Sequence, residues 1–469
     1  MPRNLYTKRQ GVVRHEFLLG KSGQGKTEAI LTKLAQQTRR GGGWAFVDAK
    51  PEEKTETIIN TMATIYGRQL DLRVIDLRNP KNSHTYNPIL SGNTTQAVST
   101  VGNIFGGDLD ASAKHFKTMM LAALQPAIGC IKEMNKAFNC QDLLILLTNP
   151  NAMNWLYNNT PQSAAKTQYN IWLDGYRTRR TDSRGNTTTE IDTQRLRTQI
   201  MGGATAMHTY SVDELGEIMN PYSPQVTWRD VIENDRMLYI KLPTMEMREQ
   251  AIPFAQMMLS DFKAYVGEMY DKGFKPAIPF LWVGDEFGSW AIEGAEELVE
   301  KMRGAGIGGI FSFQTYANLV RLSEEFAARM VGSCETRTFL ALGDTQSREF
   351  ASELIGELLK DFKSQSSSVG ESKGNTNLDI ELFHKVSQST GESRGTQQRY
   401  DYAVRPERFR DLGLGEAIVV PMAARRAFDV KFPLFDPVDS FPYRKRDIPT
   451  PDVVGLNLQA IFEQELALG

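Results

Sequence analysis

The segment GKSGQGKT at 20–27 fits the pattern GxxxxGK[ST], in which each position helps to hold phosphate groups. Its glycines allow consecutive backbone N–H groups to turn inward around phosphate oxygens, at the positive end of a following helix. Lys26 then reaches the β- and γ-phosphates, and the hydroxyl of Thr27 is a ligand of Mg²⁺. The alternative is an unoccupied Gly-rich turn. The predicted nucleotide-binding residues are consecutive: Gly20, Lys21, Ser22, Gly23, Gln24, Gly25, Lys26, Thr27 and Glu28.

Two carboxylates follow an apolar run in FLWVGDE at 280–286. A carboxylate at the tip of a strand can hold the water shell of Mg²⁺, and its neighbour can polarise an attacking water. We assign Asp285 to the metal and Glu286 to the water. A solvated strand end is the alternative for this pair taken alone, but together with the Gly-rich loop it predicts hydrolysis of a nucleotide.

Further polar side chains end other apolar runs. Gln314 closes the strand-like segment FSFQT, where its amide can sense a γ-phosphate, although an ordinary strand-end glutamine has the same sequence. Asp48 and Lys50 in VDAKPE also lie at the carboxyl end of a predicted strand, on the edge where open α/β sheets bind ligands. The alternative for these two residues is an ion pair within a turn.

Two arginines are candidates for delivery to the nucleotide of a neighbouring subunit. Arg303 precedes GAGIGGIFSF, and Arg337 lies at the start of TRTFLALG. An arginine supplied in this way stabilises the charge on a transferring phosphoryl group. A surface ion pair is the alternative for each of them.

The elements that must position these residues alternate in type along the N-terminal portion, 1–105. The order strand, helix, strand, helix, strand predicts a parallel sheet with crossover helices. The strands are expected at 15–20, 44–48 and 73–77, and the helices at 26–39 and 53–68.

Residues 106–218 change character, because helix-type spacing dominates and strand-like apolar runs are missing. We predict an all-α insertion there. Strand-like runs return afterwards, so 1–105 and 219–440 are expected to form one discontinuous α/β domain with helices on both faces of its sheet. The later strands are expected at 236–242, 279–285, 306–313, 336–343 and 416–422, and the later helices at 246–270 and 293–303.

A Ser/Gly/Gln-rich stretch at 361–399 contains the related segments SVGESKG and STGESRG. Its composition predicts a flexible, low-complexity loop, with a long hairpin as the alternative. The C-terminal tail, 441–469, is Pro-rich and extended, with a short amphipathic helix expected at about 456–466.

Composition excludes several classes of protein. The 54 basic and 56 acidic residues give a net charge of -2, which rules out a strongly basic nucleic-acid coat protein but not a local basic channel. Three cysteines without a CxxC motif argue against a disulfide scaffold or a zinc ribbon. The uncharged run at 118–131 is too short to span a bilayer, and the first residues have no apolar signal core, so we expect a soluble body.

The arrangement resembles the type IV secretion coupling proteins of the TraD/TraG group, which are related to the FtsK and HerA motor ATPases. The matching segments are spread in the expected order over roughly 15–435. They are GKSGQGKT, VDAKPE, SHTYNPI, the helical insertion, RMLYIKLP, FLWVGDEFGSW, MRGAGIGGIFSFQT, SREFASELIG and EAIVVP. Two features depart from the family: its usual transmembrane helices are missing, and SCETRTFLALGD has Cys-Glu where a small residue and Asn are expected. A nucleotide-sensing role is therefore not transferred to Glu335.

The resemblance implies a RecA-like P-loop NTPase sheet and an all-α domain, with ATP and Mg²⁺ as cofactors and assembly of a hexamer around a channel. It also implies ATP-driven delivery of DNA, of protein or of both into a type IV secretion or conjugation channel. The partners would then be DNA without sequence preference, the secretion channel, and relaxosome or adaptor proteins. The location would be the cytoplasmic side of the bacterial inner membrane, with membrane contact through an anchor outside this chain.

Two alternatives stay open. One is a DNA translocase of the FtsK/HerA type, although the helical insertion and the YNPI and VDAKPE segments favour a coupling protein. The other is a receptor platform that binds secretion substrates or adaptors, with weak ATPase activity. Residues 361–399 and the C-terminal tail are where such binding would take place.

Overall fold

A computed structural model describes residues 13–106, 110–181, 187–292, 294–371, 388–421, 426–434 and 440–462. Its centre is a nine-stranded sheet in the order β13-β12-β9-β1-β8-β7-β2-β6-β3. The strands from β9 to β3 in this order are parallel, and β12 and β13 are antiparallel to their neighbours. The mixed α/β class is therefore confirmed. The strands are β1 (Glu16–Leu19), β2 (Trp44–Asp48), β3 (Leu72–Asp76), β6 (Met237–Lys241), β7 (Phe280–Gly284), β8 (Ile307–Phe313), β9 (Thr336–Phe339), β12 (Glu416–Val420) and β13 (Phe428–Lys431).

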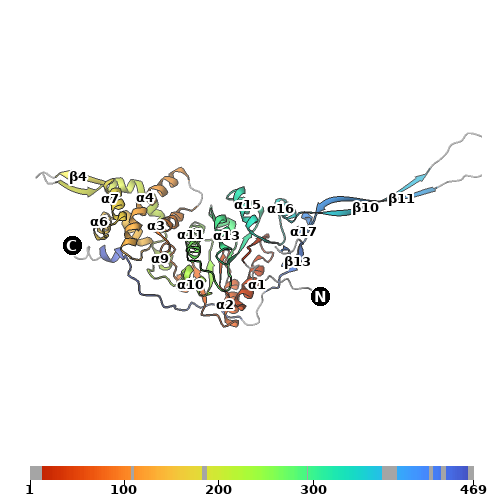
Figure 1. Cartoon of the computed structure of the whole chain (residues 1–469), viewed down its shortest axis with the longest axis horizontal. Coiled ribbons are helices and arrows are strands. Elements are labelled where there is room, and N and C mark those ends of the chain that lie inside the picture. The colour runs from red at the N-terminus through yellow and green to blue at the C-terminus, as the bar shows by residue number, and fades with distance from the viewer. Residues whose placement is uncertain are drawn as a thin grey trace, which may run out of the picture.

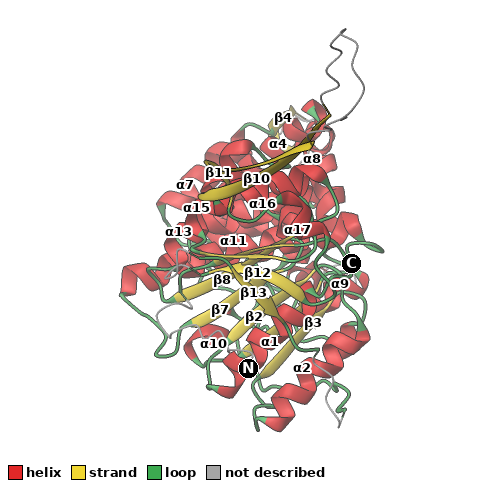
Figure 2. Ribbon diagram, turned by 90° about the vertical axis from the view of Figure 1, so that its right-hand side faces the viewer, coloured by secondary structure: helices red, strands yellow, loops and turns green. Residues whose placement is uncertain are grey.

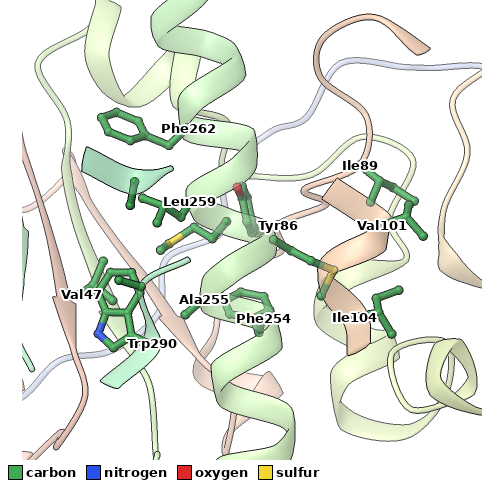
Figure 3. Packing of buried hydrophobic residues seen from close by; sticks show 14 of the residues in the cluster. Val47, Tyr86, Ile89, Val101, Ile104, Phe254, Ala255, Leu259, Phe262 and Trp290 are labelled. Carbon is green, nitrogen blue, oxygen red and sulfur yellow. The ribbon is translucent and has the colours of Figure 1, made fainter. Parts of the chain in front are cut away.

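Helices cover both faces of this sheet (Figure 2). Every residue of β2, β6, β7 and β8 is buried, as parallel strands require when both faces are covered. Alternate strand residues belong to two separate cores, so Phe46 packs with α1 (Lys26–Arg39) and α2 (Glu53–Ile65). Its neighbour Val47 packs in the larger core with α11 (Arg248–Lys272), as Figure 3 shows.

The larger core continues into a body of helices at one end of the molecule (Figure 1). Of the elements described between 111 and 219, none joins the large sheet. These elements are α4 (Ala111–Glu133), α5 (Cys140–Thr148), α6 (Pro150–Asn159), α7 (Ala164–Asp174), β4 (Arg177–Thr181), β5 (Thr187–Ile191), α8 (Thr193–His208) and α9 (Asp213–Met219). The prediction of an insertion without strands is wrong at β4 and β5, which pair as an antiparallel hairpin. These strands are polar and rich in threonine and arginine, so they contain no apolar run to reveal them.

The remaining helices surround the sheet and link it to the helical body. They are α3 (Thr94–Gly102), α10 (Trp228–Glu233), α12 (Phe287–Trp290), α13 (Ala295–Met302), α14 (Tyr316–Val320), α15 (Glu324–Ser333), α16 (Thr345–Ile355) and α17 (Pro406–Arg410). Short 3₁₀ helices lie at Pro80–Asn82 and Asn103–Phe105. None of the described helices is both long enough and apolar enough to span a membrane.

A two-stranded ribbon extends from the opposite end of the molecule (Figure 1). It consists of β10 (Glu357–Glu371) and β11 (Gln388–Tyr402), paired in antiparallel register from Glu357↔Tyr402 to Glu371↔Gln388. Residues 361–399, expected as a flexible loop with a hairpin as the alternative, thus form a hairpin where they are described. Residues 372–387 lie outside the described part of the chain.

The described part of the C-terminal tail, 440–462, runs from the sheet to the helical body as an extended strap. Asn60 on α2 donates its side-chain amide to the carbonyl oxygens of Phe441 (2.7 Å) and Pro442 (3.1 Å). At the other end, a short backbone bridge joins Ala137 to Gly455. Residues 458–462 are helical, so the helix expected at 456–466 begins two residues later, and 463–466 lie outside the described residues.

Candidate functional site

The Gly-rich loop lies between β1 and α1, at the carboxyl edge of the sheet. Neighbouring strands hold it, because the Gly20 N–H donates to the Phe313 carbonyl (3.2 Å) and the Lys21 N–H donates to the Ala341 carbonyl (3.0 Å). Helix α1 begins at Lys26, so the positive end of its dipole points into the loop. Such a helix terminus with a surrounding loop is a ready anion-binding site.

The loop depends on glycine at particular positions. Gly25 has φ +94°, a left-handed conformation that side chains rarely adopt, and a Cβ there would lie 3.2 Å from the Gly415 Cα. A Cβ on Gly20 would lie 2.9 Å from the Leu340 Cβ. The backbone thus passes so close to its neighbours that only glycine fits without a shift.

Lys26 and Glu286 meet at the base of the loop, although 260 residues separate them. The Lys26 ammonium donates to the Gly20 carbonyl (2.7 Å) and lies 3.4 Å from Glu286 Oε1. Both side chains are buried. The remaining predicted loop residues surround them: Ser22 and Gly23 are exposed, Lys21, Gln24 and Thr27 are half-buried, and the Glu28 carboxylate lies 4.0 Å from Lys54 Nζ.

Asp285 follows β7 directly and is 5% exposed. Its backbone N–H donates to the Val47 carbonyl (2.9 Å), and its own carbonyl accepts from Trp290 Nε1 (2.9 Å), which fixes the residue between two strands and α12. Its Oδ1 atom is buried without a hydrogen-bond partner. Burial raises the pKa of Asp285, and the Lys26 ammonium opposes this shift. An orphaned carboxylate oxygen beside the loop suits a magnesium ion or its water shell, with Thr27 as the second ligand.

Glu286 has a left-handed backbone, with φ 48° and ψ 38°. A residue other than glycine pays about 1–2 kcal/mol for this conformation. Ser289 secures it, because the Ser289 N–H (2.8 Å) and Oγ (2.7 Å) both donate to the Glu286 carbonyl. Strain of this kind, held by its surroundings, is typical of functional positions.

The turn after β2 completes the charged cluster. Asp48 accepts hydrogen bonds from the Tyr239 hydroxyl (2.8 Å) and the Lys50 N–H (2.9 Å). Burial and the nearby Asp285 raise the pKa of Asp48 to about 7. The Lys50 ammonium lies 3.1 Å from Glu286 Oε1. This ion pair joins the turn after β2 to the end of the neighbouring strand β7.

Gln314 follows Phe313, whose carbonyl accepts from the Gly20 N–H, so Gln314 lies next to the Gly-rich loop.

The two candidate arginines lie elsewhere within this chain. Arg303 precedes β8, at the amino edge of the sheet, where it pairs with Glu335 at 2.9 Å. Arg337 is the second residue of β9 and donates to the Leu354 carbonyl at 3.2 Å. The structure thus brings Lys26, Asp285, Glu286, Asp48 and Lys50 together, and neither arginine joins them in the same chain.

Comparisons with known proteins show that the chain is similar to coupling proteins. The family model described as the TraM recognition site of TraD and TraG matches residues 279–410. Over 412 residues the chain is 21% identical to the type 4 coupling protein DotL of Legionella pneumophila subsp. pneumophila. The chain is thus similar to the TraD/TraG coupling proteins. The DotL alignment covers 76% of this chain and 52% of DotL, so the chain spans about half the length of that relative.

Solved structures of the coupling protein TrwB have a similar fold. The bacterial conjugative coupling protein TrwBdeltaN70, in its unbound monoclinic form, matches with a TM-score of 0.60 and 13% identity over 95% of this chain and 88% of that chain. The plasmid coupling protein TrwB in complex with the ATP analogue ADPNP matches with a TM-score of 0.60 and 14% identity, over 94% and 89%. TrwB in complex with ADP and Mg²⁺ gives 0.58 and 12%, over 91% and 87%. The RecA-like fold expected from the TraD/TraG resemblance is therefore confirmed.

Some contributors to the site were not identified from the sequence. Tyr239 in β6 binds Asp48, and Trp290 in α12 binds the Asp285 carbonyl. A tyrosine within the run MLYI was the available signal, because a buried hydroxyl must find a partner. The pairing of Lys50 with Glu286 had no local signal, since it depends on β2 and β7 being neighbours.

Proposed function

We propose that this chain is an ATP-hydrolysing coupling protein that recruits DNA and drives it into a type IV secretion or conjugation channel. The observation that carries this proposal is the meeting of Lys26, Glu286 and the orphaned Asp285 Oδ1 at one loop. Its fold is that of TrwB, which has been solved with an ATP analogue and with ADP and Mg²⁺. ATP and Mg²⁺ are accordingly the proposed cofactors.

The residues of the site divide the chemistry among them. The loop N–H groups and Lys26 bind the phosphates, and Thr27 and Asp285 hold the metal. Mg²⁺, when bound, neutralises charge on the phosphate oxygens. Glu286 orients and polarises the attacking water, and Gln314 at the next strand end senses the γ-phosphate. A positioned general base of this type contributes about 10²–10⁴-fold to a rate.

We also propose a hexameric ring in which an arginine of one subunit completes the site of its neighbour. The Arg303 side chain is 53% exposed, so it can leave Glu335 for another chain. Arg337 is half-buried, and its removal would also disturb packing against α16. Arg303→Ala should therefore lower turnover without loss of stability. A mixture of the Arg303→Ala and Lys26→Ala proteins should regain some activity. No regained activity in the mixed rings would contradict a trans-acting Arg303.

The proposed domains are a nucleotide-binding domain from 1–105 and 219–440, and a mainly helical domain from 106–218 that includes the hairpin β4–β5. The proposed partners are DNA without sequence preference, the secretion channel, and relaxosome or adaptor proteins. The segment matched by the TraM-recognition model includes the ribbon β10–β11, which supports a protein partner at that end. The proposed location is the cytoplasmic face of the bacterial inner membrane.

Two variants test the ATPase. Lys26→Ala removes the charge that meets the phosphates, so nucleotide binding and turnover should both fall. Glu286→Gln should lower kcat by about 10²–10⁴-fold while ATP still binds. Lys272→Met is the control, because this lysine is exposed at the end of α11.

Turnover is measured with and without DNA, and folding is checked by circular dichroism. Wild-type hydrolysis in Lys26→Ala or Glu286→Gln would reject the site assignment. Negligible hydrolysis by the wild-type protein under both conditions would favour the receptor platform instead.

A further inference from the structure

The carboxylate of Glu286 is shared between two lysines from different parts of the fold. Its Oε1 lies 3.4 Å from the Lys26 ammonium and 3.1 Å from the Lys50 ammonium. The Glu286 and Lys26 side chains are 9% and 7% exposed, whereas Lys50 is 39% exposed. The buried carboxylate is thus contacted by one buried cation and by one that reaches it from the rim of the site.

The turn that carries Lys50 is held firmly in place. The Lys50 N–H donates to Asp48 Oδ1 (2.9 Å), while Asp48 Oδ2 accepts from the Tyr239 hydroxyl (2.8 Å). The Thr244 hydroxyl donates to the Ala49 carbonyl at 2.6 Å. These bonds tie the turn to β6 and to the segment that follows it. The backbone of Lys50 therefore has a fixed position relative to the end of β7.

The two lysines differ in what else they can do. Lys26 belongs to the phosphate-binding loop, and in the structure it also donates to the Gly20 carbonyl. When phosphates enter the loop, they attract Lys26 away from Glu286. A buried carboxylate that loses its cation is strongly destabilised, and it will either move or retain Lys26 at the expense of the phosphates.

We propose that Lys50 is the positioning residue for Glu286, holding its carboxylate in place when Lys26 turns to the phosphates. This inference rests on the proposed ATPase and concerns the same site. Lys50 acts through Glu286 and takes no part in the reaction itself. The left-handed backbone of Glu286 fixes the direction in which its side chain leaves the main chain, and the Lys50 ammonium fixes the position of its carboxylate.

Lys50→Met tests this role, because it keeps the length of the side chain and removes its charge. A displaced general base costs about 10²-fold in rate, so kcat should fall by roughly that factor. Lys50→Arg keeps the charge and should retain kcat within about threefold of the wild-type value. Lys272→Met serves as the control. Lys50→Gln is a second neutral variant in case Lys50→Met does not fold.

A binding measurement separates positioning from a direct phosphate contact or a merely structural role. The probe is a fluorescent, non-hydrolysable ATP analogue. In the presence of Glu286, Lys50→Met should weaken its Kd by about fivefold, because Lys26 is then retained by Glu286. In the Glu286→Gln background the same change should alter Kd by less than about 1.5-fold, because no carboxylate remains to be held.

Equal weakening of Kd in both backgrounds would overturn the proposal, since Lys50 would then act on the phosphates or on the fold. Unchanged kcat and Kd in Lys50→Met would also overturn it. Failure of the proposed function looks different: the wild-type protein itself would neither hydrolyse ATP nor bind the analogue.

Discussion

Replacing Leu458 by alanine tests whether the C-terminal strap is a structural part of the molecule. The Leu458 side chain is 0% exposed and belongs to the core that fills the helical body. Its N–H donates to Asp142 Oδ1 at 3.0 Å, a bond that alanine keeps. The variant therefore removes only the buried side chain, which should cost about 2–5 kcal/mol where the strap is packed.

Val454→Ala is the matched control within the same strap. Val454 is 68% exposed, although its carbonyl accepts from the Ala137 N–H at 3.1 Å. A surface change of this kind is expected within about 0.5 kcal/mol of the wild-type value. Urea unfolding, followed by circular dichroism, gives the difference between the two variants.

If the strap detaches locally, the loss of stability measured by urea unfolding will be smaller than the local loss. Amide hydrogen exchange is therefore measured as well. The N–H groups of Ala137 and Leu456 bond across the strap, to Val454 and Ala137 respectively. They should exchange faster in Leu458→Ala than in Val454→Ala. Equal stabilities of the two variants, with these amides unprotected in the wild-type protein, would refute a packed strap.

Three other outcomes can be measured. Gly25→Ala should weaken nucleotide binding about tenfold or more, as measured by fluorescence titration. The left-handed backbone, with φ +94°, costs a residue with a side chain about 1–2 kcal/mol, and the new Cβ would crowd Gly415. Burial raises the pKa of Asp261 to about 7, so the folded protein keeps a proton that the unfolded chain loses, and stability falls by up to about 1.4 kcal/mol per pH unit as pH rises towards 7. Asp261→Asn should make this fall less steep in urea titrations between pH 5 and 7, with the contribution of Asp48 remaining. Deleting 364–396 should leave the melting temperature within about 2 °C, because the ribbon stands away from the core.

The elements around the site could be predicted because their signals are local. Helix α1 has the predicted bounds, since a Gly-rich loop precedes it and three glycines follow soon after it. Strand β9 ends at Phe339, earlier than the 343 expected. The apolar residues that follow it belong instead to the turn in which Ala341 holds Lys21.

The packing of the extended tail as a strap, and the choice of a ribbon over a loop, could not be predicted because the signals for them are not local. The strap has no periodic apolar pattern, and its order comes from bonds to residues hundreds of positions away, such as Asn60. The strands of the ribbon are mostly polar, so their sequence has no apolar pattern that predicts the pairing of their backbones. Composition alone cannot separate such a ribbon from a solvated loop.

The order of the strands explains why the site gathers residues from distant parts of the chain. Strands β1, β8, β7 and β2 are neighbours, and each ends at the same edge of the sheet in one of the predicted polar groups. Arg303 instead precedes β8 and so lies at the amino edge. In a ring with head-to-tail contacts, one face of a subunit meets a different face of the next. The proposed trans-acting role of Arg303 is compatible with this placement, because its side chain is 53% exposed and pairs with Glu335 rather than with the site of its own chain.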